Sequence, residues 1–189
     1  MKIRSKNSKL LAAFPGKRVG SISRTPILNC PGAPPGGCTF MKANGKMARC
    51  YGINLGKRFP SVGKHWAMMD VLGADVWPLV ADAITREMIE VFRPFTSGGD
   101  FTSQADVDAF YWCANQCHLT RFYTYSKALC FDLWSHKPNN VTIVQSRGGI
   151  YDHLIREDRP IAEVVAVGGS TTSEQDIVAG KQKILLTAH

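Results

Sequence analysis

The first 69 residues of this 189-residue chain contain no Asp and no Glu, although they hold thirteen Lys or Arg. Residues 70–189 carry ten basic and fifteen acidic side chains, so the net charge of +8 divides into +13 and −5. A basic region of this kind can attract a polyanion, a phosphorylated ligand or an anionic cofactor, or it can be a hydrated surface that aids solubility. The basic character is therefore local to the N-terminal region.

Long apolar runs are missing as well. The apolar stretch near the basic start, Leu10–Phe14, is too short for a signal peptide, and no run approaches the length of a transmembrane helix. We therefore expect a cytoplasmic protein without membrane contact, in which the six cysteines are thiols or metal ligands rather than disulfides. The chain is long enough to bury a core, and we expect one domain over residues 1–189, with βα repeats in residues 70–189.

Three cysteines, Cys30, Cys38 and Cys50, lie in a Gly/Pro-rich loop of the basic region, and no fourth cysteine lies nearby. Thiolates bind metals and iron–sulfur clusters, and a positive surround favours the thiolate and offsets the charge of a thiolate-ligated cluster. Three protein ligands leave one metal position open. We favour an iron–sulfur cluster over two alternatives, which are loop cysteines without a metal and a structural zinc site with His65 as the fourth ligand.

Short runs rich in β-branched and aromatic residues recur along the chain, and each is closed by polar or Gly residues, which is typical of strands. Helical patterns lie between them: one over Asp75–Phe92, a second capped by Ser103, and shorter ones after Lys127, Ile150 and Ser173. Strands that alternate with helices predict a parallel sheet. About six βα units are too few for a closed eight-stranded barrel, so we expect an α/β fold with an open, partial parallel β/α barrel. The expected strands are Val19–Leu28, Phe92–Thr96, Arg121–Tyr125, Val141–Val144, Val164–Val167 and Lys183–Leu186.

The remaining cysteines are expected to be buried core residues. Cys113 and Cys117 are four apart on a predicted helix beside Phe110 and Ala114, and free cysteine is often buried. We apply the same interpretation to Cys130.

Polar residues follow several predicted strands where each strand ends. Ligands gather at the carboxyl ends of parallel strands, so these residues are candidate cofactor-binding groups. Asp100 can accept a hydrogen bond from a ligand ammonium group, whereas Lys127 and Arg147 can hold a carboxylate or phosphate, or be surface charges only. Gly98 and Gly99 permit either a tight turn or close backbone approach to a ligand. The candidate residues are Ser97, Gly98, Gly99, Asp100, Ser126, Lys127, Ser146 and Arg147.

The three-cysteine loop after the first strand and the Gly98-Gly99-Asp100 sequence after the second resemble the radical S-adenosylmethionine enzymes, whose barrel carries a cluster loop and a Gly-Gly-Glu-like motif at these places. The resemblance implies a [4Fe-4S] cluster held by three thiolates, with the open iron chelating S-adenosylmethionine. The spacing departs from the C-x3-C-x2-C pattern of that family, because seven residues separate Cys30 from Cys38 and eleven separate Cys38 from Cys50.

Nearly the whole chain is similar to a phage protein family called gene product 88. That resemblance implies a phage-encoded iron–sulfur protein in the cytoplasm of the infected host cell, and it supplies no reaction. The Ser97–Phe101 stretch contains one glycine more than the Ser-Gly-Asp-Phe expected of the family. The stretches that carry the resemblance are Asn7–Leu10, Cys30–Ala33 with Cys38, Arg49–Tyr51, Phe59–Val62, Ser97–Phe101, Tyr123–Lys127 and Ser146–Gly149.

Two functions follow from these patterns. The leading hypothesis is an iron–sulfur enzyme related to the radical S-adenosylmethionine group, acting on a small-molecule or macromolecular substrate that the sequence does not identify. The alternative is a non-enzymatic module that holds an iron–sulfur cluster or zinc and uses the basic N-terminal region to bind nucleic acid or a host protein. Phe14 is the only aromatic residue among the first 39, so few side chains there can stack on bases, and we expect weak nucleic-acid binding.

Overall fold

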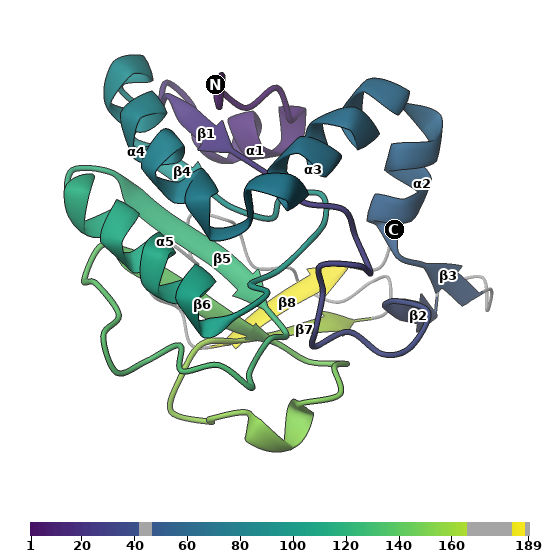
Figure 1. The fold of residues 1–189 in the computed structure, drawn as a ribbon. Coiled ribbons are helices and arrows are strands. Elements are labelled where there is room, and N and C mark those ends of the chain that lie inside the picture. Colours follow the sequence, from purple (N-terminus) through teal and green to yellow (C-terminus); the bar gives the residue numbers. More distant parts are fainter. Residues whose placement is uncertain (42–46, 166–182, 188–189) are drawn as a thin grey trace.

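The computed structural model describes residues 1–41, 47–165 and 183–187, and its main element is a six-stranded sheet (Figure 1). The strands lie in chain order, β1-β4-β5-β6-β7-β8, and every pairing between them is parallel. Among the described residues no pairing joins β1 to β8, so the sheet is open. The strands of this sheet are β1 (Val19–Ser21), β4 (Val91–Arg93), β5 (Arg121–Ser126), β6 (Val141–Ser146), β7 (Ile161–Val165) and β8 (Lys183–Thr187).

Helices and one hairpin complete the structure. A separate antiparallel hairpin, β2 with β3, precedes a pair of helices, α2 and α3, that the sequence patterns did not predict. The bounds are α1 (Ser8–Ala13), β2 (Thr39–Met41), β3 (Met47–Arg49), α2 (Tyr51–Arg58), α3 (Pro60–Leu72), η1 (Gly73–Asp75), α4 (Val76–Glu87), α5 (Gln104–Gln116) and η2 (Asp152–Leu154).

The predicted open parallel sheet of about six strands is confirmed, whereas its curvature into a partial barrel stays a prediction. The first strand is shorter than expected: β1 ends at Ser21, and Pro26–Asn29 forms turns rather than strand. Pro26 has no N–H to donate to a neighbouring strand, and Asn29 N–H instead bonds to the carbonyl oxygen of Thr25 at 3.2 Å.

The helix predictions need two corrections. The helix expected over Asp75–Phe92 ends at Glu87, because Met88 adopts a left-handed conformation (φ 51°) and the chain then enters β4. No helix follows Lys127 in the described residues, where turns cover the sheet instead, and only the single turn η2 follows Ile150. The cap at Ser103 is confirmed, since its Oγ accepts from the N–H of Asp106 at 3.1 Å. The helix expected after Ser173 lies outside the described residues.

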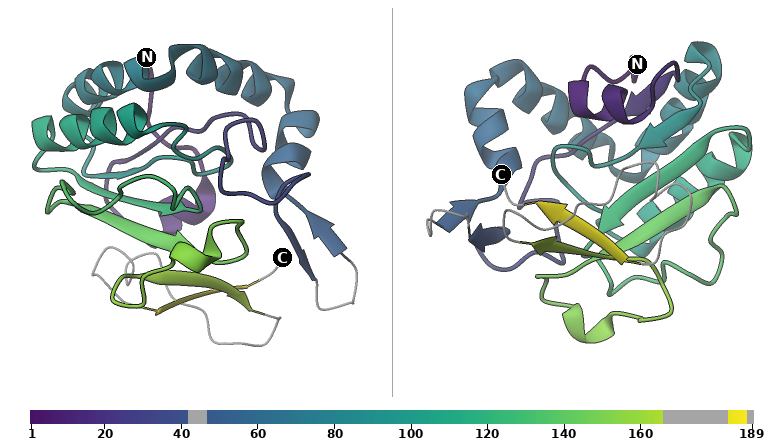
Figure 2. Two further views of the ribbon diagram at one scale, coloured as in Figure 1. Left: turned by 60° about the horizontal axis from the view of Figure 1, so that its bottom comes forward. Right: turned by 180° about the vertical axis from the view of Figure 1, so that it is seen from behind.

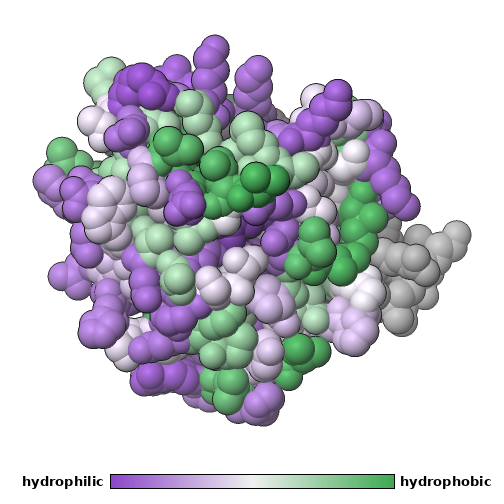
Figure 3. Space-filling model, in the orientation of Figure 1, coloured by the Kyte–Doolittle hydropathy of each residue, from purple (hydrophilic) through white to green (hydrophobic). Residues whose placement is uncertain are grey.

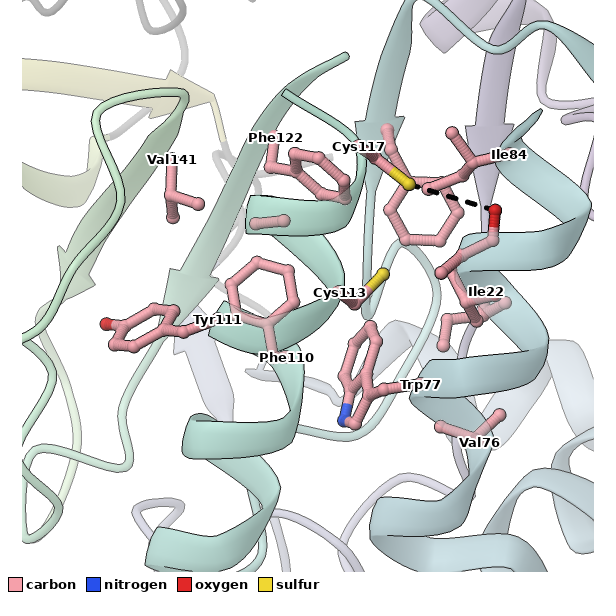
Figure 4. Close-up of a cluster of buried hydrophobic side chains, with 14 of the residues drawn as sticks. Ile22, Val76, Trp77, Ile84, Phe110, Tyr111, Cys113, Cys117, Phe122 and Val141 are labelled. Carbon is pink, nitrogen blue, oxygen red and sulfur yellow. Dashed lines mark hydrogen bonds between the residues drawn. The ribbon is translucent and has the colours of Figure 1, made fainter. Parts of the chain in front are cut away.

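Each face of the sheet is covered by a different part of the chain. Figure 2 shows α4 and α5 on one face and α1, in purple, on the other. The α4/α5 side is aromatic: the ring of Phe110 lies 4.9 Å from that of Trp77 and 5.8 Å from that of Phe122, between centroids (Figure 4). On the α1 side, Phe14 lies 5.8 Å from Tyr123. Phe122 and Tyr123 enter different core clusters because successive strand side chains point to opposite faces.

The cysteines of α5 are buried as predicted, but Cys130 is not. Cys113 and Cys117 lie within the α4/α5 core, and Cys117 Sγ donates to the carbonyl oxygen of Ala81 at 3.7 Å (Figure 4). Cys130 is exposed, because the chain after β5 forms surface turns where a core helix was expected.

One face of α3 is apolar and lies in solvent. Trp66 and Met69 are buried, whereas Met68 and Val71 are exposed, and Figure 3 shows apolar surface over the region of α3 and α4. This helix is therefore anchored to the body of the protein by one side only. Within the described residues, none of the helices combines the length and the hydropathy needed to cross a membrane.

Candidate functional site

The cysteine-bearing loop lies against the carboxyl ends of the central strands. Gly32 is buried so closely that a Cβ built on it would lie 1.8 Å from the carbonyl oxygen of Lys127, at the end of β5. The carbonyl oxygen of Gly32 accepts from the N–H of Ile150 at 3.0 Å, just beyond β6. Only glycine permits this approach. The loop and the polar strand ends, which the sequence analysis selected separately, therefore meet at one edge of the sheet.

The three loop cysteines lie in one neighbourhood. A Cβ built on Gly37, next to Cys38, would lie 3.6 Å from the Cβ of Cys50, which directly precedes α2. Electrostatic interactions link the sulfur of Cys38 to the sulfurs of both Cys30 and Cys50. All three side chains are half-buried, and none forms a disulfide.

Burial keeps two of these thiols protonated in the metal-free protein. It raises the pKa of Cys30 to about 11, although backbone N–H groups of Ile27 and Gly99 donate to its sulfur and oppose the shift. Burial also raises the pKa of Cys38, where the nearby Lys127 ammonium is the main opposing influence. Both sulfurs thus have partners that stabilise a thiolate, but ionisation requires something more, such as a metal that displaces the proton.

Asp100 is buried and fully hydrogen-bonded. Its Oδ1 accepts from Phe101 N–H and Ser126 Oγ, both at 2.8 Å, and its Oδ2 accepts from the N–H groups of Lys127 at 2.8 Å and Ala128 at 3.2 Å. Burial nevertheless raises the pKa of Asp100 to about 6. A carboxylate offers about four acceptor positions, and all are used here. Asp100 therefore joins the loop after β4 to the end of β5, and the predicted contact with a ligand ammonium would require one donor to move.

The Ser97–Gly99 stretch lies between the Cys30 loop and α2. Ser97 N–H donates to Ser23 Oγ at 2.9 Å, and Gly98 accepts from Arg24 N–H at 3.0 Å. Gly99 has φ +85°, and a Cβ there would lie 2.6 Å from the Cβ of Arg24, so both a turn and close backbone contact require glycine. On the other side, a Cβ on Gly52 of α2 would lie 2.5 Å from the carbonyl oxygen of Ser97.

Lys127 connects the ends of β5 and β6. Its Nζ donates to the carbonyl oxygens of Ser146, at 3.2 Å, and Arg147. Burial lowers the pKa of Lys127, and the nearby Cys38, Asp152 and Asp100 oppose that shift. The side chain of Arg147 pairs with Glu157 at 2.8 Å on the surface. Of the two predicted anion-binding residues, Lys127 thus lies with the thiols, and Arg147 is engaged by a carboxylate.

Part of the basic N-terminal region is neutralised by the rest of the fold. Glu90 pairs with Lys17 at 2.8 Å and with Arg18 at 3.9 Å. Arg24 is buried and pairs with Asp106 of α5, an interaction that the sequence analysis missed. Two sequence features could have indicated this ion pair. Arg24 follows the first strand, and Asp106 lies in the first turn of a helix that is largely buried.

The metal-binding prediction for this loop is not tested by the structure. In the part of the chain that the structure describes, no group of three or more His, Cys, Asp or Glu side chains is arranged to hold one metal ion, and this holds both for the three cysteines and for the zinc alternative with His65. Thiolates that hold an iron–sulfur cluster bind different irons and stand farther apart than ligands of one ion. What the structure shows is three neighbouring thiols with a lysine beside Cys38.

Comparison with known proteins identifies a family. No curated protein and no solved structure matches the chain. The family model described as gene product 88 matches residues 1–184, which is almost the full length of the sequence. The chain therefore belongs to the gene product 88 family, as its sequence motifs suggested.

Proposed function

We propose that this protein is an iron–sulfur enzyme of the radical S-adenosylmethionine type, with a [4Fe-4S] cluster held by Cys30, Cys38 and Cys50. The observation that carries the proposal is the contact of Gly32 with Lys127, because it brings the cysteine loop to the carboxyl edge of an open parallel sheet. Ligands of such sheets bind at that edge. In this proposal the sheet is a partial barrel, and the cluster lies over its mouth.

A bound cluster would supply an electron to the sulfonium of S-adenosylmethionine through the iron that no cysteine ligates. The protein's own contribution is to gather three thiolates and to balance their charge. The N–H groups of Ile27 and Gly99 stabilise the Cys30 thiolate, and the Lys127 ammonium stabilises that of Cys38. Asp100 holds the loop after β4 against the end of β5, the strand end that Gly32 of the cysteine loop also contacts.

In this proposal the cofactor would lie along the backbone of the glycine residues after β4. Gly98 and Gly99 line the edge between the Cys30 loop and α2 without a side chain of their own. Ser97 and Ser146 belong to the same edge, the latter through its carbonyl contact with Lys127. These residues would contact the cofactor through backbone groups, since the Asp100 carboxylate is already occupied.

Electron paramagnetic resonance tests the proposal. S-adenosylmethionine added to the anaerobically reduced protein should change the cluster signal, because direct chelation alters the environment of one iron. Cys113→Ala serves as a matched control, since that thiol lies in the α4/α5 core and its loss should leave the spectral change intact. An unchanged signal at saturating cofactor would count against the enzyme and leave a cluster-bearing protein without this activity.

The alternative of a nucleic-acid-binding module has less support. Arg24 is buried, and Glu90 pairs with Lys17 and Arg18, so these side chains are engaged within the protein. Phosphate binding to any of them would have to displace a carboxylate that already neutralises the charge.

A further inference from the structure

A buried ion pair between Arg24 and Asp106 lies next to the candidate site. The side chains of Arg24 and Asp106 are 1% and 0% exposed. Arg24 donates to both oxygens of Asp106, with Nη2 2.9 Å from Oδ1, and Nη2 also donates to the carbonyl oxygen of Gly73 at 2.7 Å. Asp106 accepts in addition from the indole N–H of Trp77 at 2.7 Å and from Thr102 N–H at 3.1 Å. The pair therefore ties together the segment after β1, η1, α4 and the start of α5.

Stability alone is a poor reason for such a pair. Desolvation of two charges consumes most of their attraction, and apolar residues of similar size are often equally stabilising. The planar guanidinium group of an arginine binds several acceptors at once, so it holds the segments that carry those acceptors in a fixed arrangement. The segments next to Arg24 therefore indicate what the ion pair positions.

Arg24 lies where the segment that leads to Cys30 touches the loop after β4 that contains Gly98 and Gly99, here called the glycine loop. Its N–H donates to the Gly98 carbonyl at 3.0 Å, and its Cα and Cβ form the surface against which Gly99 packs. The backbone of Gly99 also lies near enough to Cys30, six residues beyond Arg24, to oppose the rise of the Cys30 pKa. Asp106 comes six residues after Asp100, at the other end of the glycine loop.

We infer that Arg24 and Asp106 are positioning residues that hold the Cys30 loop on the Gly98–Gly99 backbone. The pair acts through the backbone and touches no ligand itself. For the cluster, this inference rests on the proposed function. The conformation of the loop is independent of the proposed function, because the contacts described above are made by protein groups alone.

Hydrogen exchange followed by mass spectrometry tests the inference on the full-length, metal-free protein. The double variant R24M/D106N keeps the approximate volume, removes both charges and leaves an acceptor for the Trp77 indole N–H. We expect exchange in peptides covering residues 25–38 to become faster by about tenfold or more, while β5 and β6 keep their protection. The matched control is Leu10→Ala, which opens a cavity in the α1 core, away from the pair, and lowers stability without touching the loop.

Two results would overturn the inference: unchanged exchange in residues 25–38 of the double variant, or an equal increase in Leu10→Ala at matched loss of stability. Arg24→Lys covers the case in which the double variant does not fold. A lysine ammonium has one nitrogen in place of the two that Arg24 uses, so it cannot reproduce the bidentate pairing with Asp106, and loop exchange should rise in this variant too. Wild-type protection in Arg24→Lys would refute the positioning by the guanidinium fork.

Iron content then separates this inference from the proposed function. After anaerobic reconstitution, the double variant should hold several-fold less iron per folded chain than wild type, and Leu10→Ala should hold as much as wild type. Full iron retention in the double variant would refute a role of the pair at the cluster. A wild-type protein without iron would contradict the proposed function, and the exchange result would still decide the loop inference.

Discussion

Gly32→Ala tests whether the cysteine loop sits on the strand ends as described. The new Cβ would lie 1.8 Å from the Lys127 carbonyl oxygen, 2.2 Å from its carbonyl carbon and 2.8 Å from Ala128 N. All three are backbone atoms, so no side-chain rotation relieves the overlap. Inserting a methyl group into a packed site costs about 1–3 kcal/mol, and a backbone clash belongs at the upper end. At about 2–4 °C per kcal/mol for a chain of this size, we expect the melting temperature to fall by roughly 6–12 °C.

Two glycines provide matched controls measured by the same thermal melt. Gly36, in the same loop, and Gly16, outside it, have φ of +80° and +74°, and a Cβ added to either would meet nothing within 4 Å. Alanine at either site therefore costs only the left-handed backbone strain, about 1 kcal/mol, or roughly 2–4 °C. If the melting temperature of Gly32→Ala equals that of Gly36→Ala instead of lying well below it, the contact between the loop and β5 is refuted.

Three further predictions follow from the same site. Replacing Cys30, Cys38 or Cys50 by Ala should abolish the visible absorbance of the anaerobically reconstituted protein. The control Cys113→Ala should retain this absorbance and lose only packing stability. Absorbance that survives the replacement of Cys30, Cys38 or Cys50 contradicts the proposed ligand set. At pH 8, iodoacetamide should label the exposed Cys130 well before the half-buried Cys30. The Cys30 rate should keep rising with pH up to about 11, since its raised pKa leaves little thiolate below that value, and labelling of Cys30 at pH 8 as fast as that of Cys130 would refute its burial. Binding to mixed-sequence DNA or RNA should be weak at physiological salt, and tight binding with a steep salt dependence that charge reversal in the basic N-terminal region flattens would favour the binding-module hypothesis.

The strands of the sheet were largely predictable from sequence, because their physical signal is local. Arg121–Ser126 and Val141–Ser146 are runs of β-branched and aromatic residues closed by Ser and Gly or Lys, and β5 and β6 occupy almost the predicted residues. The Ser103 cap has an equally local cause. The helix predicted over Asp75–Phe92 shows the limit of local patterns, because it was predicted too long. Val91 fits a helical face by its spacing, but the chain leaves the helix at the left-handed Met88 and Val91 pairs in β4.

The site was predictable as a set of segments but not as a set of contacts. Polar residues at strand ends, and a loop rich in cysteine and glycine, were selected separately from the sequence, and the structure brings them together at one edge of the sheet. The sequence did not show that the Asp100 carboxylate accepts hydrogen bonds from four groups of the protein itself. Three of these donors belong to Ser126, Lys127 and Ala128, which are far from Asp100 in the sequence. Nor did it show Arg24 with Asp106, since partners 82 residues apart leave no periodic signal.

The central claim is that Cys30, Cys38 and Cys50 hold an iron–sulfur cluster, and the metal content of the protein tests it most directly. Protein purified without oxygen should contain about four iron and about four acid-labile sulfide ions per chain, the content of one [4Fe-4S] cluster. The content should fall to background when any one of the three cysteines is replaced by Ala. Stoichiometric zinc without sulfide, or no bound metal at all after anaerobic reconstitution, would contradict the claim.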